Sequence, residues 1–319
     1  MSSYSSIPRK KRRSRRHLLS MPGKVMLKIL EKSDYRSILT LRKVSRDLRH
    51  FIDDVKPEFH IDTVEVHLYP GKIYLFLHDL ANKKSTRIHY EQVGDNVKLT
   101  SGKKWKKENL VENCSSLQYF CDDLASIFHY QKETLSSFSL HWQEIPLELQ
   151  LFLEKAKLRT RCLAITTGSP DEVMNVLPYF GGIHEICLYD SGEEIIWNMA
   201  KIIKTEQWKN AKMLEAKSFK VDVPLENFRQ FINADITIKS VSSGGLKMLK
   251  EVFLKTPDFK YFNINFETLL DKDNLYYAFG LTYFENSRFR EWYFKMPNSD
   301  KVLKLFIDYS SKRIEFSTI

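Results

Sequence analysis

The sequence contains few cysteines, few glycines and no long apolar run. Its 319 residues include 4 cysteines, 11 glycines and 10 prolines. The cysteines, at positions 114, 121, 162 and 187, form no C-x-x-C pair and no compact metal-binding spacing. No signal-peptide pattern precedes them, so we expect reduced thiols in an intracellular protein, cytoplasmic or nuclear. The longest apolar run, residues 73–77, is far too short to span a bilayer, which excludes a membrane-spanning helix.

Catalytic and cofactor-binding motifs are missing as well. The sequence contains no G-x-x-x-x-G-K-S/T, no G-x-G-x-x-G and no H-E-x-x-H. Gly244-Gly245 could present amide groups to a phosphate, but a tight strand-to-helix turn would use the same glycines. Cys114 and Cys121 suit one face of a helix and are interpreted as buried thiols, although a cysteine nucleophile stays open. The histidines are scattered without partners at ligand spacing, so we predict no enzyme, no cofactor and no metal.

Basic residues exceed acidic ones, giving a formal net charge of +10, but the excess is concentrated near the N-terminus. Seven of these charges belong to residues 9–16, where no acid occurs. Residues 1–20 combine this run with serines, so we expect them to be disordered. The run fits the acidic groove of an import receptor; a solvated tail, or one that contacts nucleic acid nonspecifically, is the alternative. The predicted import signal consists of Arg9, Lys10, Lys11, Arg12, Arg13, Arg15 and Arg16.

A short helical module is predicted at residues 21–57, beside one large domain. A hydrophobic content of 43% and a charged content of 28% are typical of a globular protein of this length. Apolar residues recur at helical spacing over 25–30 and over 41–55, with Asp34 as a candidate cap, and Pro57 ends the pattern. So short a unit buries little surface, so its apolar face should bind a partner or pack on the following domain.

Residues 21–57 resemble an F-box, the three-helix module that docks onto the Skp adaptor of SCF ubiquitin ligases. The family's Leu-Pro opening appears in this sequence as Met21-Pro22. Its Val-Cys-Arg-x-Trp ending corresponds to residues 44–48, with Ser45 for Cys and Leu48 for Trp. Residues 41–53 are close to nematode F-box proteins that also carry an FTH domain. The resemblance implies an adaptor-binding face made of Met21, Pro22, Val25, Ile29, Leu30, Ile38, Leu39, Val44 and Leu48.

After Pro57 the pattern changes from helical spacing to alternation. Residues 58–108 are predicted to form an antiparallel β-meander that links the module to the rest of the chain. From residue 109 to 319 strands and helices alternate, with a closing β-meander from about 289. The predicted strands are 61–68, 73–77, 86–90, 97–100, 138–142, 161–167, 183–189, 219–223, 236–241 and 261–266. The predicted helices are 117–128, 147–153, 171–179, 193–205, 225–232 and 245–254.

Successive strands recur at the repeat length of a leucine-rich-type solenoid. The strand positions Leu140, Ala164 and Cys187 are 24 and 23 residues apart. The later spacing is irregular, which indicates a degenerate repeat. The predicted fold class is therefore α+β or α/β: a helical module, a short antiparallel meander, and an irregular leucine-rich-repeat-like strand–helix solenoid with a β cap.

The C-terminal region resembles the FTH domain over roughly residues 109–285. Residues 206–212, EQWKNAK, match the family's Gln-Trp-Lys-x-Ala-Lys signature, with looser matches at 135–140 and 178–186. We expect Trp208 to be a core anchor, because an apolar segment leads into it. The resemblance implies a protein-recognition domain, and the identity of the recognised protein does not transfer.

The combined resemblances imply a substrate receptor of an SCF ubiquitin ligase, which would tether a target near the ubiquitin-charged enzyme without catalysis of its own. The implied partners are the Skp adaptor, a cullin through that adaptor, an unidentified target protein and an import receptor. A non-degradative F-box scaffold, suggested by Ser45 and Leu48, is the first alternative. A nucleic-acid-binding protein acting through the basic tail is the second.

Overall fold

The computed structural model describes residues 21–33, 35–57, 61–80, 83–102, 107–131, 133–192, 196–297 and 299–319. The basic tail and the Asp34 cap lie outside these residues. The chain divides into two compact units, one of residues up to 59 with 126–132, and one of residues 60–125 with 133–319. No helix in the described part is long and apolar enough to cross a membrane.

The first unit contains α1 (Gly23–Glu31), α2 (Tyr35–Val44), α3 (Arg46–Val55) and the last turn of α4 (Ser116–Tyr130). The apolar periodicity of the sequence continues through Ser45, but the helix does not. Ser45 is extended (φ −153°, ψ 159°), and its hydroxyl accepts a hydrogen bond from the Leu48 amide at 3.2 Å. This N-cap begins α3 and separates it from α2. Helix α3 ends at Val55, because the next residue, Lys56, adopts a left-handed conformation (φ 44°) before Pro57.

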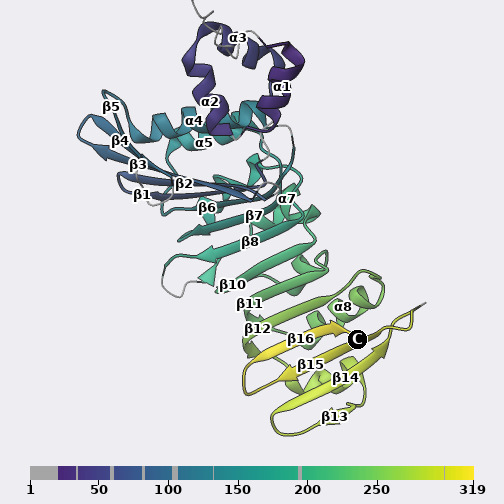
Figure 1. Cartoon of the computed structure of the whole chain (residues 1–319). Helices are drawn as coiled ribbons and strands as arrows, with labels where there is room; N and C mark the ends of the chain where they lie inside the picture. Colours follow the sequence, from purple (N-terminus) through teal and green to yellow (C-terminus); the bar gives the residue numbers. More distant parts are fainter. Residues whose placement is uncertain are drawn as a thin grey trace, which may run out of the picture. The chain divides into compact units, whose positions relative to one another are not determined.

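The second unit is built on one mixed sheet, which contains 16 strands in the described residues (Figure 1). Its centre is a run of parallel neighbours in chain order. These strands are β1 (Thr63–Tyr69), β6 (Leu135–His141), β7 (Thr160–Thr167), β8 (Glu185–Asp190), β10 (Met213–Val221), β11 (Asn233–Val241) and β12 (Tyr261–Leu269). The strand–helix alternation of the sequence produces this order, because parallel neighbours need a crossover connection.

Antiparallel strands extend both edges of the sheet. Beyond β1 lie β2 (Lys72–Asp79), β3 (Lys84–Val93), β4 (Asn96–Ser101) and β5 (Lys107–Val111). Beyond β12 lie β16 (Arg313–Thr318), β15 (Val302–Asp308), β14 (Phe289–Lys295) and β13 (Phe284–Glu285), while β9 (Ile196–Trp197) pairs with β10. The boundary predicted at residue 108 therefore falls inside one continuous sheet, since β1 pairs with β2 on one side and with β6 on the other.

The register corrects the repeat alignment by one residue. Leu140 pairs with Ile165, whereas Ala164 and Cys187 pair with each other and Ser139 pairs with Ala164. A shift of one residue moves a side chain to the other face of a sheet, so the predicted alignment mixed the two faces. Buried side chains instead align as Phe138, Leu163, Ile186 and Leu214.

The connections contain α5 (Leu147–Ala156), α6 (Pro170–Met174), α7 (Glu206–Asn210), α8 (Ser243–Leu254) and α9 (Leu275–Phe279). The predicted helix 193–205 is wrong: its described part contains β9 and a 3₁₀ helix at Ile202–Lys204. Trp197 stacks on Phe219 with ring centroids 3.9 Å apart, and this contact holds the segment against β10. The segment predicted as helix 225–232 is a 3₁₀ helix, Leu225–Phe228.

The two faces of the sheet differ. One face is covered, since Phe253 of α8 contacts Phe262 of β12 and Phe316 of β16 with ring centroids 5.3 Å apart in both pairs. Phe180, in the loop before β8, contacts Phe138 of β6 in the same way at 4.9 Å. In the strands, the residues between these buried positions point to the other face of the sheet and are mostly half-buried. We call this second face the open face.

Candidate functional site

The helical unit has a small apolar core of its own. Met26, Leu30, Ile38, Leu48 and Ile52 are each at most 5% exposed. The last turn of α4 adds Ile127 and Tyr130, which are 1% and 3% exposed. A helix more than sixty residues further along the chain therefore completes the unit, because three short helices bury too little surface alone.

A polar cluster links α2, α3 and α4. Arg42 donates from Nε and Nη2 to the two carboxylate oxygens of Asp53 at 2.7 and 3.1 Å, and the Tyr130 hydroxyl donates to Asp53 Oδ1 at 2.6 Å. The hydrogen bonds from Arg42, assisted by Tyr130, hold the pKa of Asp53 below its ordinary value. Burial and the bond to Asp53 raise the pKa of Tyr130 to about 12, so its proton stays in place at neutral pH. The cluster stabilises the unit only while Asp53 is ionised.

Asp53→Asn is expected to remove an acid-sensitive part of the stability. Because the folded-state pKa of Asp53 lies below its unfolded value of about 3.9, the stabilisation is fully present above that pH and is lost as pH falls through the folded pKa. The two side chains are 38% and 36% exposed, so solvent limits the effect to at most about 1 kcal/mol. Urea unfolding should show a smaller difference between variant and wild type at about pH 2.5 than at pH 7. Asp54→Asn, at an exposed neighbour, is the matched control, and an equal difference at both pH values would contradict the prediction.

Histidine and aromatic side chains gather at one end of the open face. We call this set the aromatic cluster: His67, Tyr69, Tyr74, Phe76, His89 and His141. Tyr74 stacks on His89 with centroids 4.4 Å apart, and His67 stacks on His141 at 5.4 Å. Burial lowers the pKa of His89, and burial together with the nearby His67 lowers the pKa of His141. These two rings are therefore neutral near pH 7 and present flat, largely apolar surfaces.

A cleft of about 830 Å³ lies beside the aromatic cluster, at the carboxyl ends of β1, β6, β7 and β8. Leu68, Ile73 and Pro146 form part of its apolar lining, and His141 and Asp190 contribute polar groups. A mostly apolar cleft with a few polar groups is the usual form of a binding site. At β1 the pairing changes from parallel, with β6, to antiparallel, with β2.

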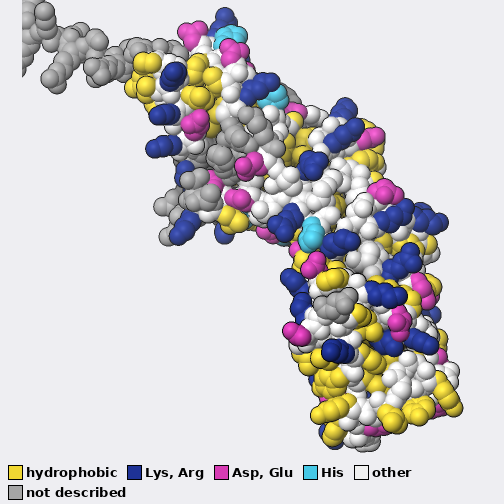
Figure 2. Space-filling model, turned by 90° about the vertical axis from the view of Figure 1, so that its right-hand side faces the viewer, with side chains coloured by type: hydrophobic (Ala, Val, Ile, Leu, Met, Phe, Trp, Pro, Cys, Tyr) yellow, Lys and Arg dark blue, Asp and Glu magenta, His cyan; other side chains and the backbone are white. Residues whose placement is uncertain are grey.

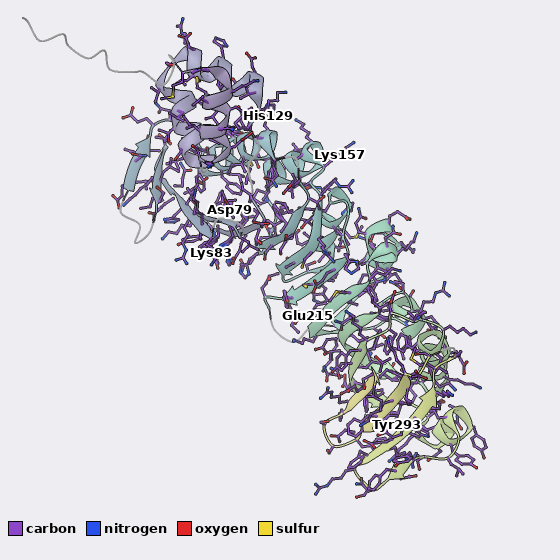
Figure 3. All side chains as sticks on the ribbon, turned by 45° about the vertical axis from the view of Figure 1, so that its right-hand side comes forward. Asp79, Lys83, His129, Lys157, Glu215 and Tyr293 are labelled. Carbon is purple, nitrogen blue, oxygen red and sulfur yellow. The ribbon has the colours of Figure 1, made fainter. Side chains whose placement is uncertain are left out.

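A chain of polar side chains joined by hydrogen bonds and ion pairs crosses the rest of the open face, and we call it the polar ladder. It consists of Tyr189, Glu215, Lys217, Asp235, Asn263 and Arg313. Glu215, labelled in Figure 3, accepts from the Tyr189 hydroxyl at 2.9 Å and lies 2.9 Å from Lys217 Nζ. At the other end Arg313 donates to Asn263 at 2.7 Å and to the Tyr261 hydroxyl at 2.7 Å. Burial opposes ionisation of Glu215, but the bonds from Lys217 and Tyr189 outweigh it and lower its pKa.

Between the aromatic cluster and the polar ladder lie Cys162, Glu185 and Cys187. Their ligand atoms are all within 4.8 Å of one another, and the Cys187 thiol donates to Glu185 Oε1 at 3.7 Å. Among the described residues these three form the group of side chains able to hold a metal ion. We call this group the cysteine cluster.

Two family models match the chain. The model for the F-box domain matches residues 18–60, and the model for the FTH domain matches residues 147–281. The chain is an F-box protein with an FTH domain. No curated protein and no solved structure matches it. The FTH match begins at α5 and so is shorter than the predicted 109–285, and the nematode type stays a prediction.

The residues predicted to bind an adaptor do not share one environment in the F-box domain. Leu30, Ile38 and Leu48 are 3%, 0% and 5% exposed and belong to its core. Val25 and Val44 are 44% and 66% exposed and can meet a partner directly. Pro22 is also exposed, Met21 and Ile29 are half-buried, and the side chain of Leu39 lies outside the described residues. Periodicity identified apolar positions but did not separate those that face inward from those that face solvent.

In the FTH domain the signature tryptophan is a core residue, as predicted. Trp208 is 1% exposed, and its Nε1 donates to the Asn227 carbonyl at 3.0 Å. Phe228 and Phe231 surround the indole with centroids 5.7 and 5.1 Å away. The signature therefore anchors α7 to the following 3₁₀ helix.

The glycine pair lies in the first turn of α8 and not in a turn before the helix, and two amide groups of this turn are already bonded. The Gly245 amide donates to Ser242 Oγ at 3.1 Å, and the Ser243 amide donates to Asp271 Oδ1 at 2.6 Å. The Asp271 carboxylate therefore occupies the position at this helix N-terminus that a phosphate would take. A Cβ on Gly245 would lie 3.1 Å from Leu225 Cδ1, so close packing explains the glycine.

The two N-terminal cysteines do not share a helix face, because Cys114 precedes α4 and only Cys121 lies in it. Burial raises the pKa of Cys121 to about 11, which keeps this thiol protonated. Sequence reasoning missed the aromatic cluster, the polar ladder and the cysteine cluster. The alternation within a strand indicates which of its side chains share a face. Which residues of neighbouring strands become neighbours depends on the strand register, which only the folded sheet shows.

Proposed function

We propose that this chain is the substrate receptor of an SCF-type ubiquitin ligase. The observation that carries the proposal is the presence of an F-box domain and an FTH domain in one chain. F-box domains typically bind a Skp adaptor and, through it, a cullin, while FTH domains are protein-interaction modules. Neither family is enzymatic, so the contribution of this chain would be tethering, which raises the effective concentration of target lysines near the charged enzyme.

The finer fold assignment belongs to the same proposal: a three-helix F-box followed by an irregular leucine-rich-repeat-like solenoid with a β cap. Helices α1–α3 support the first part. The parallel strands support the second, because the paired positions Phe138, Leu163 and Ile186 are 25 and 23 residues apart. Solenoids of this type bind partners on an extended sheet face.

We place the target protein on the open face, with the cleft and the aromatic cluster as the anchoring region. Half-exposed tyrosine and histidine rings supply large contact area at a low cost in side-chain entropy. Hydrogen bonds along the polar ladder hold its side chains in fixed positions, which favours specific over nonspecific binding of a partner.

Co-purification of the full chain with a Skp adaptor tests the proposal directly. A stable one-to-one complex, which then recruits the cullin, is the expected result in size-exclusion chromatography with light scattering. A soluble chain that forms no complex would contradict it. A complex that binds a target without transferring ubiquitin to it would support the non-degradative scaffold instead.

For localisation we propose a nuclear and cytoplasmic protein whose residues 9–16 act as an import signal. The support is the composition of this run, which lies outside the described residues. On the face drawn in Figure 2, lysines and arginines are interspersed with acids, which does not favour a nucleic-acid-binding body. A fluorescent fusion without residues 1–20 that still accumulates in the nucleus would count against the import signal.

A further inference from the structure

The cysteine cluster is assembled by the pairing of two parallel strands. Cys162 on β7 pairs with Glu185 on β8, and Cys187 follows two positions later on the same face of β8. Ala164 stands opposite Cys187 and carries only a small methyl side chain. Cys187 is 5% exposed, while Cys162 and Glu185 are half-buried. Two thiols and a carboxylate therefore converge on one point of the open face.

This set of donors has the composition of a zinc site. Zinc binds cysteine sulfur at about 2.3 Å and carboxylate oxygen at about 2.0–2.2 Å in tetrahedral geometry. Two sulfurs on one tetrahedral ion are then roughly 3.8 Å apart. The three donor atoms already lie within 4.8 Å of one another, so small side-chain rotations bring them onto one ion. The carboxylate matters here, because it completes a metal site but has no role in a disulfide.

We infer that Cys162, Glu185 and Cys187 bind a Zn²⁺ ion with three protein ligands. The fourth position is open toward the open face, where water or a side chain of a bound protein can occupy it. The surroundings favour a cation: Glu215 pairs with Cys187 across β8 and β10, and Asp235 pairs with Glu215 across β10 and β11. Lys217 offsets part of this charge through Glu215 and Asp235, at 2.9 and 3.7 Å. The inference is independent of the proposed ligase function.

Cobalt titration of the full chain tests the site. The protein is first stripped with a chelator under reducing conditions and then titrated with Co²⁺. We expect one equivalent to bind with thiolate-to-cobalt charge-transfer absorption, and Zn²⁺ to displace it one for one. Binding without charge-transfer absorption, or no binding, would overturn the inference.

Substitutions assign the ligands. Cys162→Ser and Cys187→Ser should each weaken Zn²⁺ binding by more than about 100-fold, because loss of an outer-shell partner alone typically costs 10–100-fold. Glu185→Gln keeps both thiols and the half-buried position, so it should retain the charge-transfer absorption but bind at least about tenfold more weakly. Cys114→Ser is the matched control and should leave binding unchanged, because this thiol lies outside the cluster.

Two results would reject the site even if one variant failed to fold. Unchanged zinc affinity in folded Glu185→Gln, checked by circular dichroism, would remove the carboxylate as a ligand. A Cys162–Cys187 disulfide found by mass spectrometry in protein purified with Zn²⁺ present and no reductant would establish a redox pair instead.

Discussion

Replacing Val25 by aspartate and Val44 by lysine is expected to weaken binding to the Skp adaptor by at least about 100-fold. Both valines are exposed, at 44% and 66%, and lie within the F-box match. Burying even an uncharged polar group without a counterpart costs about 1–3 kcal/mol and burying a charge costs more, so two charges of at least about 2 kcal/mol each exceed the roughly 2.8 kcal/mol that a 100-fold change requires.

The two charges suit the helices that carry them. Val25 is in the first turn of α1 and Val44 is the last residue of α2, so an acid at the first position and a base at the second complement the helix dipoles. The free energy of unfolding should therefore change by less than about 0.5 kcal/mol. Isothermal titration calorimetry measures the affinity, with His50→Ser on the exposed side of α3 as the control. Affinity within threefold of wild type would contradict the predicted adaptor face.

Trp208→Ala is expected to lower the free energy of unfolding of the sheet unit by about 3–5 kcal/mol. The indole is 1% exposed and packs against Phe228 and Phe231, so its removal leaves a cavity that these rings fill only in part. It also leaves the Asn227 carbonyl without the Nε1 donor that now lies 3.0 Å away. Urea unfolding followed by circular dichroism measures the loss.

Two further variants make this measurement specific. Tyr277→Ala removes an aromatic ring that is 82% exposed and should change the unfolding free energy by less than about 0.5 kcal/mol. Trp208→Phe keeps most of the volume but loses the hydrogen bond, so it should lie between alanine and wild type. A loss below about 1 kcal/mol for Trp208→Ala would show that the signature tryptophan is not a core anchor.

Strands with clear alternation were predicted close to their observed bounds. β7, β11 and β12 begin within three residues of their predicted starts, because buried side chains recur at every second position over 163–167, 234–238 and 262–266. β10 was predicted six residues late, at 219 instead of 213. Its pairing with β11 shifts between Ala216 and Val221, and this irregularity breaks the alternation that the prediction relied on. Two-residue β9 depends on Trp197 stacking on Phe219, which no local pattern indicates.

The candidate sites likewise include features that local sequence predicts and features that depend on tertiary contacts. Resemblance to known families identified the F-box and FTH segments from sequence, because Met21-Pro22, residues 44–48 and the EQWKNAK signature are local motifs, and the family models match both segments. The sequence could not separate the exposed Val25 from the buried Leu30, since both fit one helical stripe and only tertiary packing decides which of them is covered.

Residues that are far apart in the chain meet only through the pairing of strands in the folded protein. Cys162 and Cys187 are 25 positions apart, and His67 and His141 are 74 apart, so no motif links them. Parallel strand pairing brings Cys162 beside Glu185, and His67 beside His141, because β7 and β8, and likewise β1 and β6, are neighbours in the sheet although long connections separate them in the chain. Periodicity predicted a helical module, a short β-meander and a region in which strands and helices alternate. Strand register determined the chemistry that the open face carries, because a shift of one residue would have turned every one of these side chains inward.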